Sequence, residues 1–208
     1  MPASGAVQSV EAVVFDLGGV LIDWNPRHLY RKLIDDEAAM EDFLDTVCTL
    51  EWHAAHDRGV PFERSCAQLA ARHPAHAELI WAWARRSEEM VAGAIEGSVE
   101  ILRELLARGM PCYALTNMEA ETYPLRRERF PFMSWFQGTM VSAHEGSIKP
   151  EPAIFLRLLE RFGPRAATTV FIDDSEPNVV AARVLGLQAV RFRSPPQLRA
   201  WLADAGLL

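Results

Sequence analysis

Residues 10–21 read VEAVVFDLGGVL, an apolar run that leads to Asp16 and is followed by two glycines. Consecutive apolar residues such as those at positions 12–15 are typical of a strand buried on both faces of a sheet. Gly18 and Gly19 allow the chain to bend sharply after the strand and expose backbone groups at close range. This stretch therefore predicts a buried strand that ends at a carboxylate.

The second half of the chain repeats one order of elements: a helical pattern, a glycine that ends it, and a β-rich run. The glycines are Gly109, Gly163 and Gly186, and the runs after them are MPCYAL, TTVFID and LQAVRF. Such units predict parallel strands with crossover helices, because tight hairpins cannot connect parallel strands. We expect an α/β fold with a Rossmann-like parallel sheet and helices on both faces.

The residues between the first strand and this repeated order have a different character. Helical patterns cover about 26–34, 37–49, 61–72 and 75–92, and we expect no strand among them. A helical insert after the first strand would lie over the carboxyl edge of the sheet, where open α/β sheets bind ligands. We therefore expect a core of residues 1–23 and 97–208 and a helical cap of residues 24–96.

Composition and charge limit the class of protein. The 208 residues are 50% hydrophobic and carry a net charge of −7, which argues against a surface that coats nucleic acid. The sequence shows neither a membrane span nor a secretion signal, and three widely spaced cysteines are typical of reduced thiols. We expect a cytoplasmic globular protein, monomer or homodimer, without a nucleic-acid or membrane partner.

Polar residues follow apolar runs at four places. The segments are FDLGGV at 15–20, ALTN at 114–117, SIKP at 147–150 and FIDDS at 171–175, the last followed by Asn178. A single carboxylate after a strand is commonly a helix cap or a turn residue. Parallel strands would bring several of these segments to one sheet edge, where clustered carboxylates repel one another unless a cation lies among them. Oxygen ligands together with a substrate phosphate suit Mg²⁺.

Taken as an ordered set, FDLGGVL, TN, KPEP and DDSxxN resemble the motifs of the haloacid dehalogenase-like (HAD) superfamily, over roughly residues 10–193. The Asp-Leu-Gly pattern resembles the glucose-1-phosphatase-like branch, and the helical insert looks like the family's C1 cap. The resemblance implies Mg²⁺-dependent hydrolysis of a small phosphate ester, such as a sugar phosphate.

The resemblance also implies a role for individual residues. Asp16 would be the nucleophile that forms an aspartyl-phosphate, Thr116 and the following backbone N–H groups would hold phosphoryl oxygens, and Lys149 would neutralise charge. Asp16, the carbonyl of Gly18 and Asp174 would bind Mg²⁺, with Asp173 either a ligand or a neighbour of one. Substrate contacts are expected at Gly18, Asn117 and His53.

Gly18 departs from the family pattern, because most phosphatases of the family have a second Asp at this place for general acid and base catalysis. Such catalysis contributes about 10²- to 10⁴-fold. The dehalogenase branch instead has an aromatic residue there. The absence of that aromatic residue, together with the paired Asp173 and Asp174, counts against a metal-free dehalogenase. Two alternatives stay open: a 2-haloacid dehalogenase-type hydrolase that uses Asp16, and a non-catalytic HAD-fold protein that binds a ligand.

Residues 51–58, EWHAAHDR, concentrate polar side chains within the helical insert. On a helix, His53 and His56 share a face. Three roles stay open for this cluster: packing of the insert on the core, contact with the substrate, and a surrogate acid or base role. The last is possible because histidine titrates near neutral pH. A zinc site lacks a third soft ligand. Arg126, Arg127 and Arg129 are expected on a solvated helix face.

Overall fold

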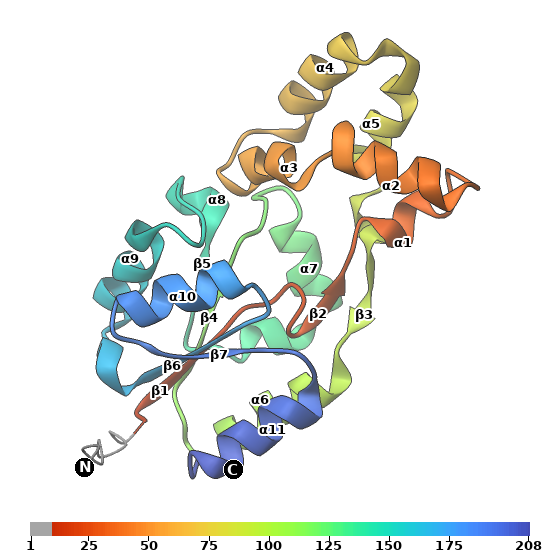
Figure 1. The fold of residues 1–208 in the computed structure, drawn as a ribbon. Coiled ribbons are helices and arrows are strands. Elements are labelled where there is room, and N and C mark those ends of the chain that lie inside the picture. Colours follow the sequence, from red (N-terminus) through yellow and green to blue (C-terminus); the bar gives the residue numbers. More distant parts are fainter. Residues whose placement is uncertain (1–9) are drawn as a thin grey trace, which may run out of the picture.

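The computed structural model describes residues 10–208, so the first nine residues of the expected core segment 1–23 lie outside the described residues. Within 10–208, five parallel strands form the central sheet in the order β5-β4-β1-β6-β7 (Figure 1). They are β1 (Ala12–Phe15), β4 (Cys112–Thr116), β5 (Gly138–Val141), β6 (Thr169–Asp173) and β7 (Gln188–Arg191). The predicted α/β, Rossmann-like class is confirmed.

The strand register brings the expected site segments to one edge of the sheet. Phe15 on β1 pairs with Ala114 on β4 and with Ile172 on β6. The backbone N–H of Asp16 donates to the carbonyl of Ile172 at 2.8 Å, so the chain leaves β1 still aligned with β6. Polar residues that follow these strands therefore lie near one another.

Helices cover both faces of the sheet, because successive residues of each buried strand point to opposite faces. Helices α6 (Glu96–Ala107) and α11 (Pro195–Asp204) pack with Val13 and Phe15 on one face. Helices α9 (Pro152–Phe162) and α10 (Glu176–Val184) pack with Val14 and Phe171 on the other. The short helices α7 (Tyr123–Arg129) and α8 (Ser142–Glu145) follow β4 and β5.

A separate group of helices lies beyond the carboxyl edge of the sheet (Figure 1). It consists of α1 (Arg27–Tyr30), α2 (Glu37–Thr46), α3 (Leu50–Asp57), α4 (Phe62–Arg72) and α5 (Ala77–Arg85). Short 3₁₀ turns cover Pro74–His76, Ser87–Met90, Pro131–Ser134 and Ala166–Thr168. The helices enclose an apolar cluster of their own that includes Tyr30, Met40 and Trp83. This separate cluster supports the predicted division into a core and a helical cap, which remains a proposal.

The expectation of no strand within the helical insert was wrong. β3 (Val91–Ala94) pairs antiparallel with β2 (Ile22–Trp24), and together they connect the helices to the sheet domain. The range 75–92, predicted as one helix, contains α5, a 3₁₀ turn and the first residues of β3. Periodicity in the sequence could not show this, because the pairing joins residues about seventy positions apart.

Two further local expectations need correction. The helix predicted over 37–49 ends earlier, at Thr46. The next helix, α3, begins after Thr49, whose hydroxyl accepts a hydrogen bond from the Trp52 N–H at 3.0 Å. β5 was not predicted, since its four residues include Gly and Thr and lack a clear apolar run. In the described part of the chain, no helix combines the length and apolar character needed to cross a membrane.

Candidate active site

Lys149 connects two carboxylates at the edge of the sheet. Its Nζ lies 2.7 Å from Oδ1 of Asp16 and 2.8 Å from Oδ2 of Asp173, and it donates to the Leu115 carbonyl at 2.9 Å. The Lys149 side chain is 1% exposed. Burial alone lowers the pKa of this ammonium, but the charges of Asp16 and Asp173 raise its pKa above the ordinary value. A permanent positive charge is thus fixed beside Asp16.

Asn117 positions the backbone of Lys149. The Asn117 amide nitrogen donates to the Lys149 carbonyl at 3.0 Å, and the Lys149 N–H donates to the Asn117 side-chain oxygen at 2.8 Å. Two hydrogen bonds to one residue restrain its position and orientation. The end of β4 therefore sets where the ammonium stands.

Asp173 and Asp174 differ in their surroundings. The Asp173 carboxylate is fully buried and accepts from Lys149, from the Asn178 amide at 3.0 Å and 3.1 Å, and from the Ser175 N–H at 2.8 Å. Asp174 is exposed, lines the cavity and lies beside Gly19. Asp173 therefore holds Lys149 and the following turn, while Asp174 is free to contact a ligand.

The carboxylates of Asp16, Asp173 and Asp174 form a cluster suited to a cation. They offer ligand atoms within 4.8 Å of one another. Burial raises the pKa of Asp16, and the negative charges of Asp173 and Asp174 oppose the pull of Lys149 on it. Three carboxylates against one ammonium leave excess negative charge, and hard oxygen donors match Mg²⁺. The donor set therefore fits such an ion.

Gly18 and Gly19 have different constraints. Gly19 has a φ of +72°, and a Cβ atom on it would collide with the Asp174 carboxylate. Gly18 lacks a positive φ, and apart from Gly18 itself and its two chain neighbours, no heavy atom of residues 10–208 lies within 4 Å of where its Cβ would stand. Gly19 thus lets Asp174 approach the loop, whereas Gly18 faces open space in the cavity.

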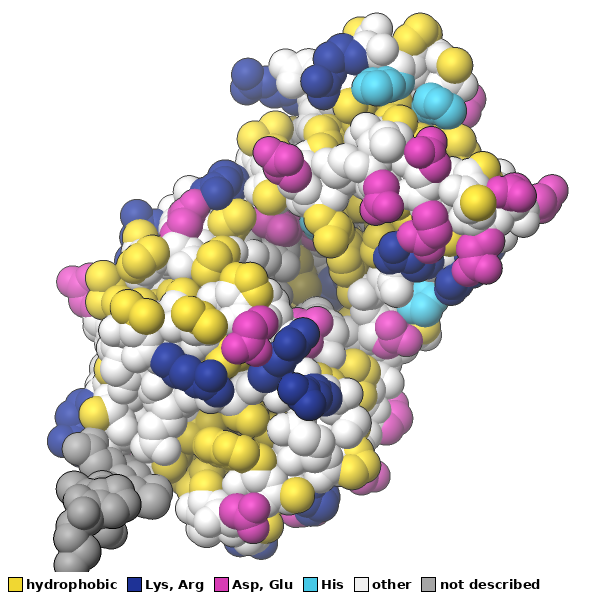
Figure 2. Space-filling view, viewed as in Figure 1, with side chains coloured by type: hydrophobic (Ala, Val, Ile, Leu, Met, Phe, Trp, Pro, Cys, Tyr) yellow, Lys and Arg dark blue, Asp and Glu magenta, His cyan; other side chains and the backbone are white. Residues whose placement is uncertain are grey.

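A cavity of about 740 Å³ separates the sheet edge from the helices above it. Asp16, Gly18, Asn117, Lys149 and Asp174 line its floor, and His53 contributes to the opposite wall. Figure 2 shows the surface recessed here, with hydrophobic side chains on the walls. Apolar wall residues include Ile22, Trp24, Leu44, Leu50 and Ala54.

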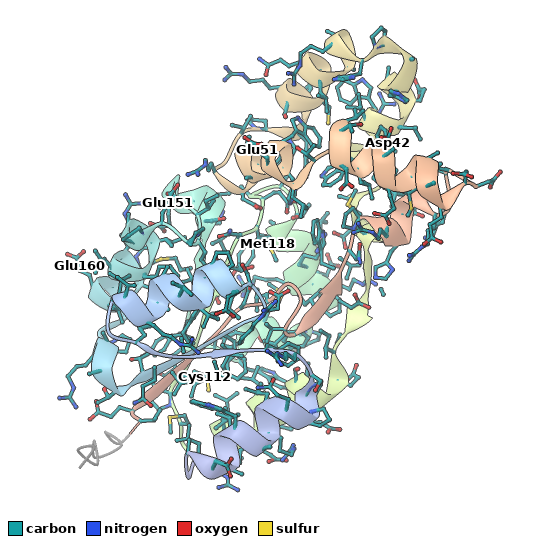
Figure 3. The ribbon with its side chains drawn as sticks, in the orientation of Figure 1. Asp42, Glu51, Cys112, Met118, Glu151 and Glu160 are labelled. Atoms are coloured by element: carbon teal, nitrogen blue, oxygen red, sulfur yellow. The ribbon has the colours of Figure 1, made fainter. Side chains whose placement is uncertain are left out.

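Thr116 lies behind the cavity wall. It is 1% exposed, and its hydroxyl is 3.4 Å from the Asn117 carbonyl oxygen. The N–H of Met118 donates to the Ser142 hydroxyl at 3.0 Å. Figure 3 places Met118 between the sheet and α3, the helix that carries Glu51. Of the backbone groups expected to hold phosphoryl oxygens, the Met118 N–H is thus engaged within the protein.

A second polar cluster occupies the wall formed by α3. His53 Nε2 lies 3.4 Å from Glu119 Oε1 and 3.7 Å from Asp57 Oδ1. The Thr122 hydroxyl donates to the other Glu119 oxygen at 2.7 Å. The His53 ring stacks on Trp24 with ring centroids 5.2 Å apart. The expected common face of His53 and His56 is confirmed, with their Nδ1 atoms 3.4 Å apart.

Sequence reasoning missed several members of the cavity wall, and Glu119 and Arg126 are among them. Glu119 follows the Thr-Asn motif by two residues, and this proximity was the one available signal. Arg126 was expected on a solvated face, but it is 2% exposed and donates to Glu88 at 2.7 Å. The expectation failed because α7 packs against the cap, a contact that a local charge pattern does not report.

The sequence matches the haloacid dehalogenase-like hydrolase family over residues 10–186. It is 30% identical over 178 residues to the sesquiterpene phosphatase astK of Aspergillus oryzae, which covers 85% of this chain and 87% of that protein. It is 26% identical to the ribulose-1,5-bisphosphate 5-phosphatase of Halopiger xanaduensis, over 87% of this chain and 84% of that protein.

The fold is also similar to that of a HAD family enzyme from Bacteroides thetaiotaomicron, solved in complex with magnesium and inorganic phosphate. The TM-score is 0.67 at 22% identity, with 89% of this chain and 96% of that chain covered. At this level of identity the similarity concerns the fold.

Proposed function

Because this chain belongs to the haloacid dehalogenase-like hydrolase family, we propose that it hydrolyses a small phosphomonoester through an aspartyl-phosphate on Asp16. One observation carries the proposal: the Asp16 carboxylate lies 2.7 Å from a buried ammonium and lines the cavity. A carboxylate that attacks an anionic phosphate needs fixed positive charge to offset repulsion. Lys149 supplies that charge.

The chemistry is divided into two displacements. In the first, an Asp16 oxygen forms a bond to phosphorus while the bond to the ester oxygen breaks. In the second, water attacks phosphorus and Asp16 leaves as a carboxylate. Lys149 stabilises the negative charge in both transition states, and Asn117 and Asp173 keep its ammonium in place. The Asn117 N–H is proposed to bind a phosphoryl oxygen, with Gly18 lining the substrate path. A phosphoryl contact of the Thr116 hydroxyl stays a prediction, because that side chain is buried behind the cavity wall.

We assign Mg²⁺ to Asp16, Asp174 and the Gly18 carbonyl, with Asp173 beside them. The assignment is supported by the mutual approach of the three carboxylates and by the engagement of Asp173 with Lys149, Asn178 and Ser175. When bound, the ion would supply further positive charge to the phosphoryl oxygens. The chain's part is to hold the carboxylates near one another.

The cavity supports an organic phosphate as the substrate. Its volume of about 740 Å³ admits a small metabolite, and its wall beyond the carboxylates is largely apolar. A relative is named a sesquiterpene phosphatase, and such an ester combines a phosphate with an apolar group. His53 lies where the organic group would contact the wall. A cytoplasmic location is supported by the buried free thiols of Cys48, Cys66 and Cys112.

The proposal is tested by hydrolysis of p-nitrophenyl phosphate with Mg²⁺, and with EDTA in its place. We expect turnover that EDTA removes and Mg²⁺ restores. A panel of phosphorylated sugars and apolar alcohol phosphates then identifies the substrate class. Chloride release from 2-chloropropionate without phosphate hydrolysis would instead establish the dehalogenase alternative. Binding without turnover of either ester or haloacid would establish the non-catalytic one.

A further inference from the structure

Asp57 is a buried acid that the phosphate chemistry described above leaves without a role. It lies at the end of α3, is 7% exposed and lines the same cavity as Asp16. Among residues 10–208, its Oδ1 atom has no hydrogen-bond partner. His53 Nε2 lies 3.7 Å from this Oδ1, which is beyond hydrogen-bond distance. A buried carboxyl oxygen without a hydrogen bond is costly, so the position of Asp57 needs an explanation.

The groups that face Asp57 come from both sides of the cavity. His53 and Arg58 belong to its own helix, Glu119 follows β4, and Lys149 lies on the floor. Arg58 also pairs with Glu151, which fixes the end of α3 over the loop that carries Lys149. His56, on the same helix, packs against Trp52 and Phe62. Asp57 therefore lines the cavity from α3, on the wall that also contains His53 and Glu119.

The protonation of Asp57 suits a group that delivers a proton. Burial raises its pKa to about 6, with the Glu119 charge adding to the effect and His53 opposing it. Although burial alone raises the pKa of Glu119, the charge of His53 and the Thr122 hydroxyl hold it below its usual range. Two carboxyls thus share one wall, and Asp57 is the one whose pKa lies closer to neutral pH.

The direction of attack places the leaving group on the side of α3. In phosphoryl transfer, the attacking and leaving oxygens are roughly in line. Asp16 lies at the sheet edge, and α3 lies across the cavity from it (Figure 1). An ester oxygen that departs away from Asp16 therefore moves toward the wall that contains Asp57. Gly18, on the floor, has no side chain that could protonate it.

We propose that Asp57 is the general acid that protonates the departing ester oxygen and the general base that then activates water. In the first step the Asp57 proton passes to the ester oxygen as its bond to phosphorus breaks, which releases an alcohol and leaves Asp57 as a carboxylate. In the second, water loses a proton to Asp57 as its oxygen bonds to phosphorus, and Asp16 is freed. His53 and Glu119 are positioning residues. The inference rests on the proposed phosphatase function.

The test compares leaving groups of different acidity. Wild-type protein and Asp57→Asn are assayed with p-nitrophenyl phosphate, whose leaving group needs little protonation, and with phenyl phosphate, whose leaving group needs more. We expect Asp57→Asn to lose about 10²- to 10⁴-fold on phenyl phosphate. The loss on p-nitrophenyl phosphate should be much smaller. Asp42→Asn, at an exposed position on α2 (labelled in Figure 3), is the matched control and should leave both rates unchanged.

A second variant places a replacement carboxyl on the loop after β1, within the same cavity. Gly18 faces open space, so Asp57→Asn with Gly18→Asp should recover part of the rate on phenyl phosphate. Equal losses on both esters from a folded Asp57→Asn protein would overturn the proposal. So would a raised requirement for Mg²⁺ without a change in leaving-group dependence, since that would assign Asp57 to cation binding. If wild-type protein hydrolyses neither ester, the proposed function itself fails.

Discussion

The Nζ atom of Lys149 lies 2.7 Å from Oδ1 of Asp16, and both side chains are buried. This ion pair connects two sequence motifs of opposite charge. Asp16 follows the strand β1, and Lys149 lies on a loop. The ammonium that we propose to stabilise the phosphoryl group also contacts the proposed nucleophile. Removing either partner should therefore produce different and separable effects on activity and on stability.

Asp16→Asn should abolish hydrolysis while the fold is retained. The amide has the shape of the carboxylate and can still accept from Lys149, but it cannot form the covalent phosphate ester. We expect a loss of about 10³-fold or more. The measurement is the steady-state rate on p-nitrophenyl phosphate, with circular dichroism to verify folding. Asp204→Asn, at an exposed position on α11, is the control. Substantial turnover by folded Asp16→Asn would show that another group is the nucleophile.

Lys149→Met should destabilise the protein because Asp16 and Asp173 lose their common partner. Breaking a buried ion pair typically costs about 3–5 kcal/mol. Burial already raises the pKa of Asp16, and loss of Lys149 removes the charge that opposes this rise, so acid should favour the folded state by protonating Asp16. Urea unfolding at several pH values measures this. A variant as stable as wild type at pH 8 would contradict the account.

Gly18→Ala and Gly19→Ala should have opposite outcomes. At Gly18 a methyl group meets open space, so stability should change by no more than about 0.5 kcal/mol. At Gly19 the positive φ and the collision with Asp174 should cost about 1–3 kcal/mol. Gly19→Ala should also raise the Mg²⁺ concentration needed for half-maximal activity. Thermal unfolding and Mg²⁺ titration of both variants provide the measurement, and indistinguishable results would refute the proposed geometry.

The sequence predicted the features that depend on local, repeated patterns, such as where helices end and strands begin. Gly109, Gly163 and Gly186 each adopt a positive φ at the end of a helix, so these glycines do mark where helices stop and strands follow. The placement of Asp16 and Asp173 at one edge followed from parallel strands alone. Nothing in the local pattern showed that Lys149 would reach both Asp16 and Asp173, because the contact depends on how far its loop extends across the sheet.

Long-range contacts account for what the sequence left undecided. Asp173 and Asp174 are adjacent and chemically identical, yet strand alternation buries one against Lys149 and turns the other toward the cavity. The pairing of β2 with β3 and the approach of Glu119 to His53 both join segments far apart in the chain. Such contacts are set by packing of the helical segment on the sheet, and no short motif encodes them.

The buried acid on α3 should be detectable through stability alone, without any substrate. Burial raises the pKa of Asp57 from 3.8 to about 6, so the folded protein binds the proton more tightly than the unfolded chain. Its contribution therefore favours folding at low pH and is lost as pH rises through about 4 to 6. The Asp57→Asn variant has no carboxyl to titrate at this position, so its stability does not show this decrease as the pH rises. Between pH 4 and pH 7, the stability of Asp57→Asn relative to wild type should increase by up to about 3 kcal/mol.

Urea unfolding of both proteins across this pH range makes the comparison. Burial lowers the pKa of His56 to about 4, which makes acid destabilising through that residue, but His56 is present in both proteins and cancels in the difference. Asp42→Asn should give a difference from wild type that is flat with pH. A flat difference for Asp57→Asn would mean that Asp57 titrates as an ordinary exposed carboxyl. Its protonated fraction at neutral pH would then be far smaller than that of an acid whose pKa is about 6, and the case for Asp57 as the proton donor would fail.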